Sequence, residues 1–364
     1  MADYNFAPDG TLDLNSDGRG TVSDYEYDHL RRLTQVLLDV DGSDLETANA
    51  ITLLGYDSQD HLTDVTDPNN GTTVYDYDDL GNLVAQSSPY TGTTSFGYDP
   101  AGNVTTRTDA EGRTFAYAYD ARNRITSIIT PLPLDDLFYD YDSCFNGINR
   151  LCSVSQGNEF TDYSYNVFGD ITAHQGVGYS YDASGRIQTV SYPSGDSVTY
   201  HYDSSGQIDR VDALINGTPR TLASNISYAP FGPLTSLTYG NGAVLSQTVD
   251  TAYRLSAQSI AGVFQRNYTE YDANGNLNTV QDLIANTSDQ YGYDALDRMN
   301  SASGGFGTQS LDYDLNGNRL SSQTNSGTTN YAYDADSNRM SQINSTPVVL
   351  DANGNTLSDC PGSA

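Results

Sequence analysis

The dipeptide Tyr-Asp recurs along almost the whole chain, and this repeat restricts the folds open to the chain more than any other feature. Intact copies place their aspartates at Asp28, Asp57, Asp78, Asp99, Asp120, Asp142, Asp182, Asp203, Asp272, Asp294, Asp314 and Asp334. Degenerate copies fill the gaps at Tyr165-Asn166, Tyr228-Ala229, Val249-Asp250 and Leu350-Asp351. The commonest spacing is about 21 residues, and a fixed period of this length indicates a repeat array rather than separate globular domains.

Each unit follows the pattern Y-x-Y-D-x-x-G-N-L, as in residues 75–83. Tyrosines at alternate positions lie on one face of a strand, because strand side chains alternate between faces. The aspartate begins a turn through its side-chain acceptor, glycine and asparagine tolerate a positive φ, and an apolar residue begins the return strand. The pattern therefore predicts a β-hairpin in every unit, followed by a second turn that leads to the next unit.

Sixteen such hairpins amount to roughly thirty strands, whereas an open twisted sheet rarely exceeds about ten strands without curling, splitting or closing. We therefore expect an all-β fold, an antiparallel β-hairpin repeat array curled into a spiral shell-like or barrel-like wall. We expect a lead-in over residues 1–20, one continuous array over residues 21–355 and a tail over residues 356–364.

The net charge of the chain is −31, from 47 acidic residues and 16 basic residues that are all arginine. This charge opposes binding to nucleic acids and to anionic membranes, both of which attract basic surfaces. The composition is also too polar for membrane insertion, and the N-terminus shows no signal-peptide pattern. Only five residues are glutamate, so the acidity is mostly the aspartate of the turns.

We interpret the repeated tyrosines and aspartates as scaffold, because no reaction needs a catalytic residue sixteen times. The representative structural positions are Tyr27, Asp28, Tyr77, Asp78, Tyr98, Asp99, Tyr119, Asp120, Tyr181, Asp182, Tyr271, Asp272, Tyr293 and Asp294. We expect no catalytic residue, no cofactor and no metal.

The units Y-D-x-x-G-N-L and Y-D-x-x-x-R-L closely resemble the YD repeats of the Rhs family, which also occur in the C component of insecticidal toxin complexes and in teneurins. The resemblance extends from about Thr21 to Asn355. It implies a β-sheet that spirals into a hollow shell. Bacterial members enclose a C-terminal toxin in this shell, and teneurins use it as an extracellular adhesion scaffold.

The chain departs from the bacterial pattern in lacking a D-P-x-G-L-type release motif, since Asp67-Pro68 and Asp99-Pro100 are not followed by the required Gly-Leu. Self-cleavage and a toxin of its own are therefore not implied. The expected function is a non-catalytic scaffold, part of a shell that encloses a toxin or is displayed at the cell surface. A secreted or cell-surface location follows from the resemblance. The alternative is an extracellular binding or adhesion module that recognises a protein or a glycan.

Cys144 and Cys152 flank a turn insertion that contains Asn146-Gly147. Residues paired across a short hairpin have Cβ atoms roughly 4.5–5.5 Å apart, close to what a disulfide requires. A disulfide and two free thiols both stay open, and the export implied by the resemblance favours the disulfide. We expect Cys360 to be unpaired.

The remaining candidates for chemistry are four histidines and one acidic segment. His29, His61, His174 and His201 occupy ordinary repeat positions, and no G-x-S-x-G, C-x-x-C or H-x-x-x-H spacing is present, so neither catalysis nor zinc is expected. Residues 13–24 match the first half of a calcium loop and have Asp24 at the twelfth position. This segment is interpreted either as an ordinary turn or as a calcium loop, which would need a helix on each side.

Overall fold

The computed structural model describes residues 2–39, 49–230 and 232–357, and within these ranges it is nearly all β-structure. It contains 33 strands and one short 3₁₀ helix, η1 (Pro133–Asp135). Strands that follow one another in the chain pair antiparallel, as β7 pairs with β8. The predicted all-β antiparallel hairpin array is therefore confirmed. No helix in the described ranges is long and apolar enough to cross a membrane.

The chain divides into two compact units, each described separately below. Unit 1 comprises Met1–Thr114, Glu270–Val280 and Thr287–Ala364, and unit 2 comprises Phe115–Thr269 and Gln281–Asn286. The expected domain boundaries at residues 20 and 355 stay a prediction.

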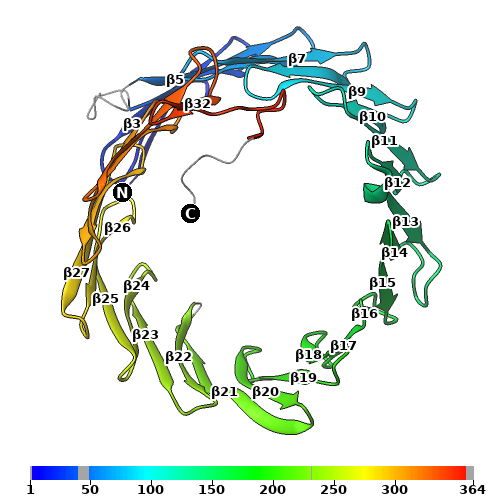
Figure 1. The fold of residues 1–364 in the computed structure, drawn as a ribbon, viewed down its shortest axis with the longest axis vertical. Helices are drawn as coiled ribbons and strands as arrows, with labels where there is room; N and C mark the ends of the chain where they lie inside the picture. The colour runs from blue at the N-terminus through cyan, green and yellow to red at the C-terminus, as the bar shows by residue number, and fades with distance from the viewer. Residues whose placement is uncertain (1, 40–48, 231, 358–364) are drawn as a thin grey trace. The chain divides into compact units, whose positions relative to one another are not determined.

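The strands up to the first unit boundary are β1 (Asp3–Phe6), β2 (Leu12–Ser16), β3 (Val22–Tyr27), β4 (Leu33–Leu38), β5 (Ala50–Tyr56), β6 (Leu62–Thr66), β7 (Thr72–Tyr77), β8 (Leu83–Ser88), β9 (Gly92–Tyr98), β10 (Val104–Thr108) and β11 (Thr114–Tyr119). The next are β12 (Ile125–Ile129), β13 (Leu137–Tyr141), β14 (Leu151–Gln156), β15 (Glu159–Tyr165), β16 (Ile171–His174), β17 (Val177–Tyr181), β18 (Ile187–Ser191), β19 (Ser197–Tyr202), β20 (Ile208–Ile215), β21 (Thr218–Tyr228), β22 (Leu234–Tyr239), β23 (Val244–Val249) and β24 (Leu255–Ile260). The last are β25 (Phe264–Tyr271), β26 (Leu277–Asp282), β27 (Thr287–Tyr293), β28 (Met299–Gly304), β29 (Gly307–Tyr313), β30 (Arg319–Thr324), β31 (Gly327–Tyr333), β32 (Met340–Ile343) and β33 (Thr346–Pro347). Figure 1 labels most of these strands.

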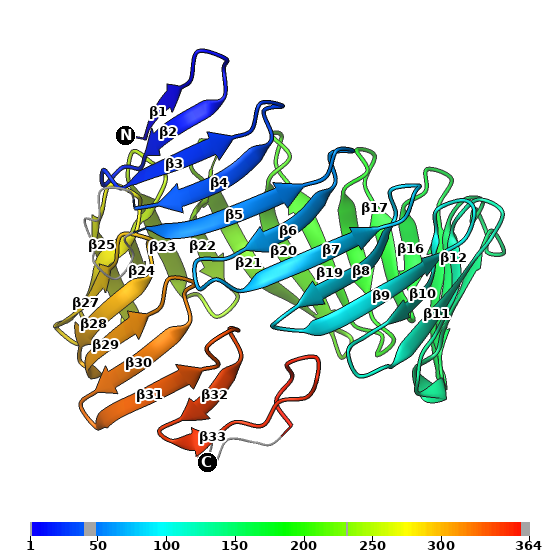
Figure 2. The ribbon, with the colours of Figure 1, turned by 90° about the horizontal axis from the view of Figure 1, so that it is seen from above.

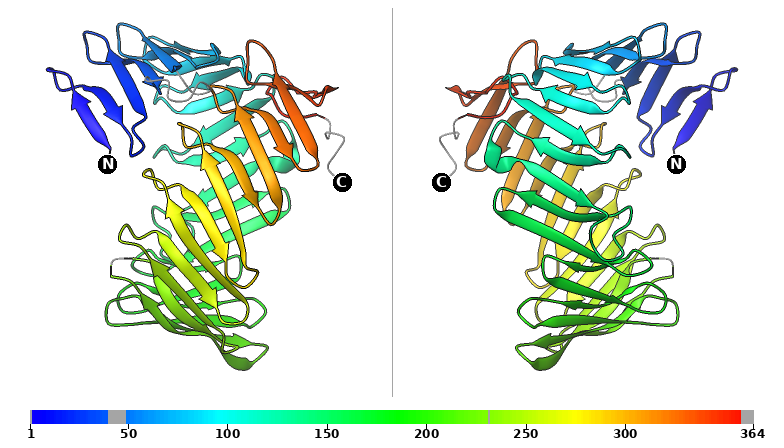
Figure 3. Two further views of the ribbon diagram at one scale, coloured as in Figure 1. Left: turned by 90° about the vertical axis from the view of Figure 1, so that its left-hand side faces the viewer. Right: turned by 90° about the vertical axis from the view of Figure 1, so that its right-hand side faces the viewer.

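Each Tyr-Asp unit is a hairpin whose first strand ends at the second tyrosine. In β7, Tyr75 and Tyr77 are half-buried while Asp76 between them is exposed, as the alternation of side chains predicts. Tyr75 pairs with Gln86 of β8, and the register shifts between Asp76 and Tyr77. Consecutive hairpins follow one another side by side, as the green strands of unit 2 do in both panels of Figure 3.

Residues 3–16 belong to the same sheet although they carry no Tyr-Asp signal. Strand β1 pairs with β2, and β2 pairs with β3. The hairpin pattern is therefore already present within the segment that we expected to be a lead-in.

The sheet has no central apolar core in the described residues, because only six apolar residues are buried. They are Ala50, Cys152, Ala213, Leu245, Ala302 and Leu311. Most side chains of the strands are half-buried. Backbone ladders, cross-strand pairs and turn contacts must therefore supply a larger share of the stability than in a layered globular domain.

The turn glycine of the repeat adopts the backbone conformation that the sequence pattern predicts. Gly81, Gly102, Gly185 and Gly275 have φ between 78° and 94°, in the left-handed region that favours glycine. At the same position of another unit, Asn123 has a φ of 60°. Asparagine therefore tolerates this position, as expected for a short polar side chain.

Replacing Gly185 by valine should lower the free energy of unfolding by roughly 1–3 kcal/mol, the usual size of a strained backbone position. A Cβ atom at Gly185 would meet no other atom within 4 Å, so the loss would come from the backbone rather than from a clash. Gly185→Asn is the matched control and should cost much less. Chemical denaturation of the three proteins measures the difference. Equal losses for the two variants would show that φ does not limit this turn.

In unit 1, turns near the beginning of the chain contact turns near its end. The Asp17 turn between β2 and β3 is held by Asn274, whose Nδ2 donates to Asp17 Oδ2 at 2.7 Å. The turn between β6 and β7 meets the turn between β29 and β30, where Asn69 Nδ2 donates to Asp314 Oδ2 at 2.8 Å (Figure 2). We call this set of contacts between early and late turns the seam.

A third contact of the seam joins Asp109 to Asn353. Asn353 Nδ2 donates to Asp109 Oδ2 at 3.0 Å, and Asn353 Oδ1 accepts the backbone N–H of Ala110 at 3.0 Å. Burial by itself would raise the pKa of Asp109. Hydrogen bonds from the Arg113 and Asn353 side chains and from backbone N–H groups outweigh this effect and lower the pKa to about 2.

Unit 1 should therefore lose stability in acid. An aspartate has a pKa of about 3.9 in an unfolded chain, so the contribution of Asp109 is fully present above about pH 4 and is lost as the pH falls toward 2. Asn353→Ala removes one of the hydrogen bonds that favour the charged form, so it should raise the pH at which unit 1 begins to unfold. Urea titrations at pH 7, 4 and 2.5 measure this effect. An unchanged acid profile in Asn353→Ala would contradict it.

Candidate functional site

The repeated aspartate uses both of its carboxylate oxygens within its own turn. Asp78 Oδ1 accepts the backbone N–H groups of Leu80 and Asn82, at 2.9 and 2.8 Å, and Asp78 Oδ2 accepts Asn82 Nδ2 at 2.9 Å. The side-chain hydrogen bond from Asn82 is the largest cause of a lowered pKa at Asp78. In other turns, the corresponding N–H groups, two and four residues after the aspartate, donate to Asp28, Asp99, Asp120, Asp182, Asp272 and Asp294.

The repeated tyrosine is equally occupied, because its hydroxyl donates to a backbone carbonyl of the preceding hairpin. Tyr77 Oη lies 3.0 Å from the carbonyl oxygen of Leu62, and Tyr98 Oη lies 2.7 Å from that of Leu83. Tyr181 and Tyr293 make the corresponding bonds to Ile171 and Leu277. These side chains act in the scaffold itself.

The fifth residue of many Tyr-Asp turns covers the tyrosine ring of the next repeat. The guanidinium carbons of four such arginines lie 4.2–4.9 Å from the centre of such a ring, in the pairs Arg32–Tyr56, Arg124–Tyr141, Arg186–Tyr202 and Arg298–Tyr313. Arg150, the last residue of the longer turn that begins at Asp142, lies 5.5 Å from the ring centre of Tyr165. His61 stacks on Tyr77 in the same way, with ring centres 4.6 Å apart. Cations over aromatic rings are attracted to the negative ring face.

The turn that begins at Asn166 departs from this arrangement by having a carboxylate at its fifth position. In Tyr165-Asn166-Val167-Phe168-Gly169-Asp170 the first turn position is Asn166 and the fifth is Asp170, so the carboxylate has moved from the beginning of the turn to its end. Asn166 Oδ1 still accepts the N–H groups of Phe168 and Asp170, at 2.9 and 3.0 Å. The hairpin is therefore kept, and no arginine is present at the fifth position to cover Tyr181.

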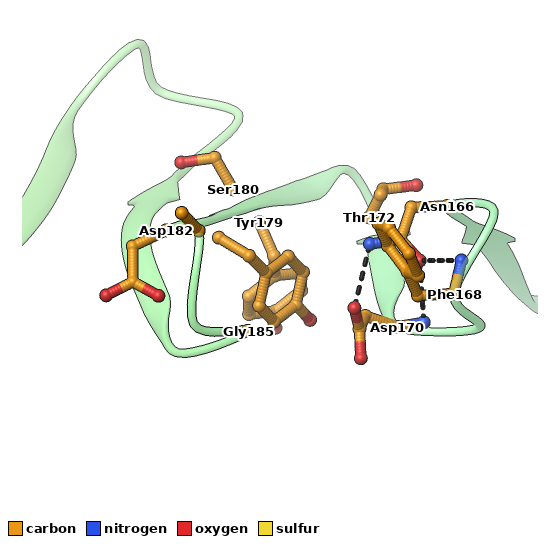
Figure 4. Close-up of a pocket in the computed structure, with 10 residues that line it drawn as sticks. Asn166, Phe168, Asp170, Thr172, Tyr179, Ser180, Asp182 and Gly185 are labelled. Carbon is orange, nitrogen blue, oxygen red and sulfur yellow. Dashed lines mark hydrogen bonds between the residues drawn. The ribbon is translucent and has the colours of Figure 1, made fainter.

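A cavity lies beside this turn. It has a volume of 740 Å³ and is lined by Asn166, Phe168, Asp170, Thr172, Tyr179, Ser180, Tyr181, Asp182, Ala183 and Gly185. Figure 4 shows Phe168 and Asp170 on one turn and Tyr179 across the cavity from them. Phe168 is 86% exposed, which is unusual for a large apolar side chain. Exposed apolar groups in a polar-rimmed cavity mark binding sites, so this cavity is the candidate functional site.

Three stretches of the chain, residues 56–94, 98–132 and 181–213, match the model of the RHS Repeat family. The chain therefore contains Rhs repeats. The Tyr-Asp hairpins in these three stretches are the Rhs, or YD, repeats that the model describes. No relative was found among the curated proteins.

Solved structures of Tc toxins share the fold of this Rhs-repeat protein. A variant of the Tc holotoxin pore of Photorhabdus luminescens matches with a TM-score of 0.80 at 16% identity, over 99% of this chain and 23% of that chain. The crystal structures of TcdB2-TccC3-Cdc42 and of TcdB2-TccC3 also match with TM-scores of 0.80 at 16% identity, over 98% of this chain and 23–24% of those chains. The Rhs-repeat protein thus spans about a quarter of the length of these structures.

The segment proposed as a turn or a calcium loop, residues 13–24, is the β2–β3 hairpin of the Rhs-repeat sheet. Asp17 Oδ1 accepts the N–H groups of Arg19 and Thr21, both at 2.9 Å. The flanking elements are the strands β2 and β3, and the next element along the chain is the strand β4. The helix–loop–helix alternative is therefore wrong. No group of metal-ligating side chains is found in the described part of the chain.

The histidines of the Rhs-repeat protein have ordinary partners. His61 Nδ1 lies 2.9 Å from Asp57 Oδ2, and His201 Nε2 lies 2.9 Å from Asp212 Oδ2. His174 stacks on Tyr163, with ring centres 4.7 Å apart. His29 lies in the turn after β3. The absence of catalysis at these positions stays a prediction.

Cys144 and Cys152 lie close together across the inserted turn. Cys144 is in the loop between β13 and β14 and Cys152 is in β14, and the structure joins their sulfurs across a Cα–Cα distance of 5.4 Å. Formation of this bond in the native protein stays a prediction. Cys360 lies outside the described residues.

Sequence reasoning missed the cavity beside Asp170. The signal was present in the repeat alignment, because Asp170 is the one acidic residue at the fifth position of a Tyr-Asp-type turn. The neighbouring degenerate dipeptide was interpreted only as a weakened copy of the repeat.

Proposed function

We propose that this Rhs-repeat protein is a non-catalytic scaffold, part of the wall of an Rhs-type shell that encloses a polypeptide such as a toxin. The observation that carries the proposal is that the repeated tyrosines and aspartates, the residues that define the chain, are used by the hairpins themselves. Tyr77 and Asp78 have their polar atoms bound within the sheet and the turn. The similarity of fold to Tc toxin structures supports the same function.

The proposed location is outside the cytoplasm, either secreted or at the cell surface. The position of one pair of cysteines supports it. The sulfurs of Cys144 and Cys152 lie in bonding position, and disulfides persist in oxidising compartments.

Enclosure can be tested with a guest sequence. We would fuse an unstructured, protease-sensitive segment after Ala364 and compare its rate of cleavage with that of the same segment fused to an unrelated β-protein. The shell proposal predicts slower cleavage of the guest in the Rhs-repeat fusion, since the wall would restrict access of the protease. Cleavage at the rate of the control, with the repeat array intact, would contradict enclosure.

The second candidate function is an extracellular binding or adhesion module that recognises a protein or a glycan. The specific observation in its favour is the cavity lined by Phe168, Asp170 and Tyr181. A binding module needs no enclosed guest, so rapid cleavage in the fusion experiment would favour it.

A further inference from the structure

The turn of residues 166–170 differs from its neighbours in how well its carboxylate is satisfied. Asp78 accepts three hydrogen bonds within its turn. In the exceptional turn the two backbone N–H groups bind Asn166, and the Asp170 carboxylate accepts one hydrogen bond, from Asn166 Nδ2 at 2.8 Å. A carboxylate can accept about four hydrogen bonds, so Asp170 keeps acceptor capacity toward the cavity that it lines.

The next repeat contributes the aromatic ring that a cation would need. Tyr181 lines the same cavity as Asp170. Burial raises the pKa of Tyr181, and the nearby negative charge of Asp170 raises it further. The corresponding ring of the following repeat, Tyr202, is covered by Arg186 at 4.2 Å, and Arg186 NH2 also lies 2.6 Å from Asp182 Oδ2.

We propose that this cavity binds the guanidinium group of an arginine side chain supplied by another polypeptide. The guanidinium would stack on Tyr181 and pair with Asp170, as Arg186 stacks on Tyr202 and pairs with Asp182 inside the chain. A planar guanidinium covers a ring and binds both carboxylate oxygens, which an ammonium group does less well. This proposal goes beyond the scaffold function and does not depend on enclosure.

The surroundings of the cavity favour a polypeptide over a free cation. Phe168 offers an exposed apolar surface to the methylene groups of an arginine side chain. A second cavity of 300 Å³ adjoins the first through Tyr179 and Tyr181, which line both. Its other lining residues are Tyr163, Ile171, His174 and Ile187. The pair of cavities therefore has room for an arginine and an adjacent apolar residue.

The test compares how tightly three peptides bind to the full chain. They are acetyl-Gly-Arg-Leu-Gly-amide and its counterparts with citrulline or lysine in place of arginine. Citrulline keeps the shape of arginine without its charge. We expect the arginine peptide to bind at least about fivefold more tightly than the citrulline peptide, and more tightly than the lysine peptide, in calorimetric or NMR titrations. Equal binding of the arginine and citrulline peptides, or no binding of the arginine peptide at about 5 mM, would overturn the proposal.

Variants locate the binding site. Asp170→Asn should reduce the affinity for the arginine peptide to that for the citrulline peptide, and Phe168→Ala should weaken both peptides. Asp196→Asn, in another exposed turn of unit 2, is the control and should leave binding unchanged. If Asp170→Asn bound the arginine peptide as tightly as the parent chain, the site would lie elsewhere.

A double variant supplies the missing arginine from within the chain. Asn166→Asp combined with Asp170→Arg gives this turn the arrangement of the Asp182–Arg186 turn, so the new side chain should cover Tyr181 and abolish peptide binding. A double variant that still binds the peptide would contradict the proposal. Glycan recognition is the competing outcome: an oligosaccharide whose binding is lost in Phe168→Ala, together with no response to arginine peptides, would overturn the arginine site.

Discussion

Replacing Arg298 by methionine should lower the free energy of unfolding by about 3–5 kcal/mol, the usual cost of leaving a buried charge without its partner. Asp294 is 4% exposed, and Arg298 Nε donates to its Oδ2 at 2.5 Å. The methionine would leave the carboxylate with two backbone N–H groups, from Leu296 and Arg298, at 3.0 and 2.9 Å. The variant would also lose the hydrogen bond from Arg298 NH1 to the carbonyl of Asp314 and the stacking on Tyr313.

Arg186→Met is the matched control because it removes the same contacts at a more exposed place. Arg186 pairs with Asp182 and covers Tyr202, but the side chains of Arg186 and Asp182 are 35% and 17% exposed. An exposed ion pair contributes about 0–1 kcal/mol, so this variant should change the urea midpoint little. Equal losses in the two variants would show that burial of Asp294 does not set the cost.

The double variant Asp294→Asn with Arg298→Met separates charge from packing. It removes the uncompensated charge, and Asn166 shows that asparagine can bind both backbone N–H groups of such a turn. We therefore expect it to recover a large part of the stability lost in Arg298→Met. No recovery would assign the loss to the tyrosine packing instead.

The hairpins could be predicted from the sequence because each is specified locally. The alternation of Tyr75 and Tyr77, the acceptor of Asp78 and the positive φ of Gly81 all lie within seven residues. Each of these signals favours the same hairpin, and agreement between local preferences is what makes a sequence easy to interpret.

The seam could not be predicted, because its contacts join residues far apart in the chain. Asn274 and Asn353 have the same turn environment in sequence as many other asparagines, and nothing in the sequence indicates that they bind Asp17 and Asp109. The partner of each turn depends on how the sheet of unit 1 curves, which results from small twists added over many strands.

The cavity at Asp170 could be predicted from the sequence only in part. Its cause is local, since Asp170 stands at the turn position where the arginine of other turns, such as Arg186, covers the next tyrosine. Its effect is not local, because the uncovered ring of Tyr181 belongs to the following repeat. Comparing each turn position across all the repeats, rather than searching for catalytic motifs, is the step that would have found it.

If Cys144 and Cys152 form the predicted disulfide, the free energy of unfolding of the oxidised protein should exceed that of the same protein after reduction by about 2–3 kcal/mol. The oxidised protein should therefore unfold at a higher urea concentration. The two residues close a loop of eight positions, and the loop-entropy model assigns a stabilisation of this size to such a constraint on the unfolded chain. Comparison of the oxidised and reduced forms of one protein avoids the packing change that a substitution of the buried Cys152 would add.

The bond itself can be mapped without ambiguity, because Arg150 lies between the two cysteines and the chain contains no lysine. Trypsin should cut the chain into peptides that include residues 125–150, with Cys144, and residues 151–186, with Cys152. Only a disulfide between Cys144 and Cys152 would keep these two peptides together after digestion. Protein made in an oxidising compartment, digested without reductant, should therefore give one linked species that separates on reduction. Cys360 should appear in residues 340–364 as an alkylated thiol. Recovery of all three cysteines as alkylated thiols would contradict the disulfide, and it would remove a main support for a location outside the cytoplasm.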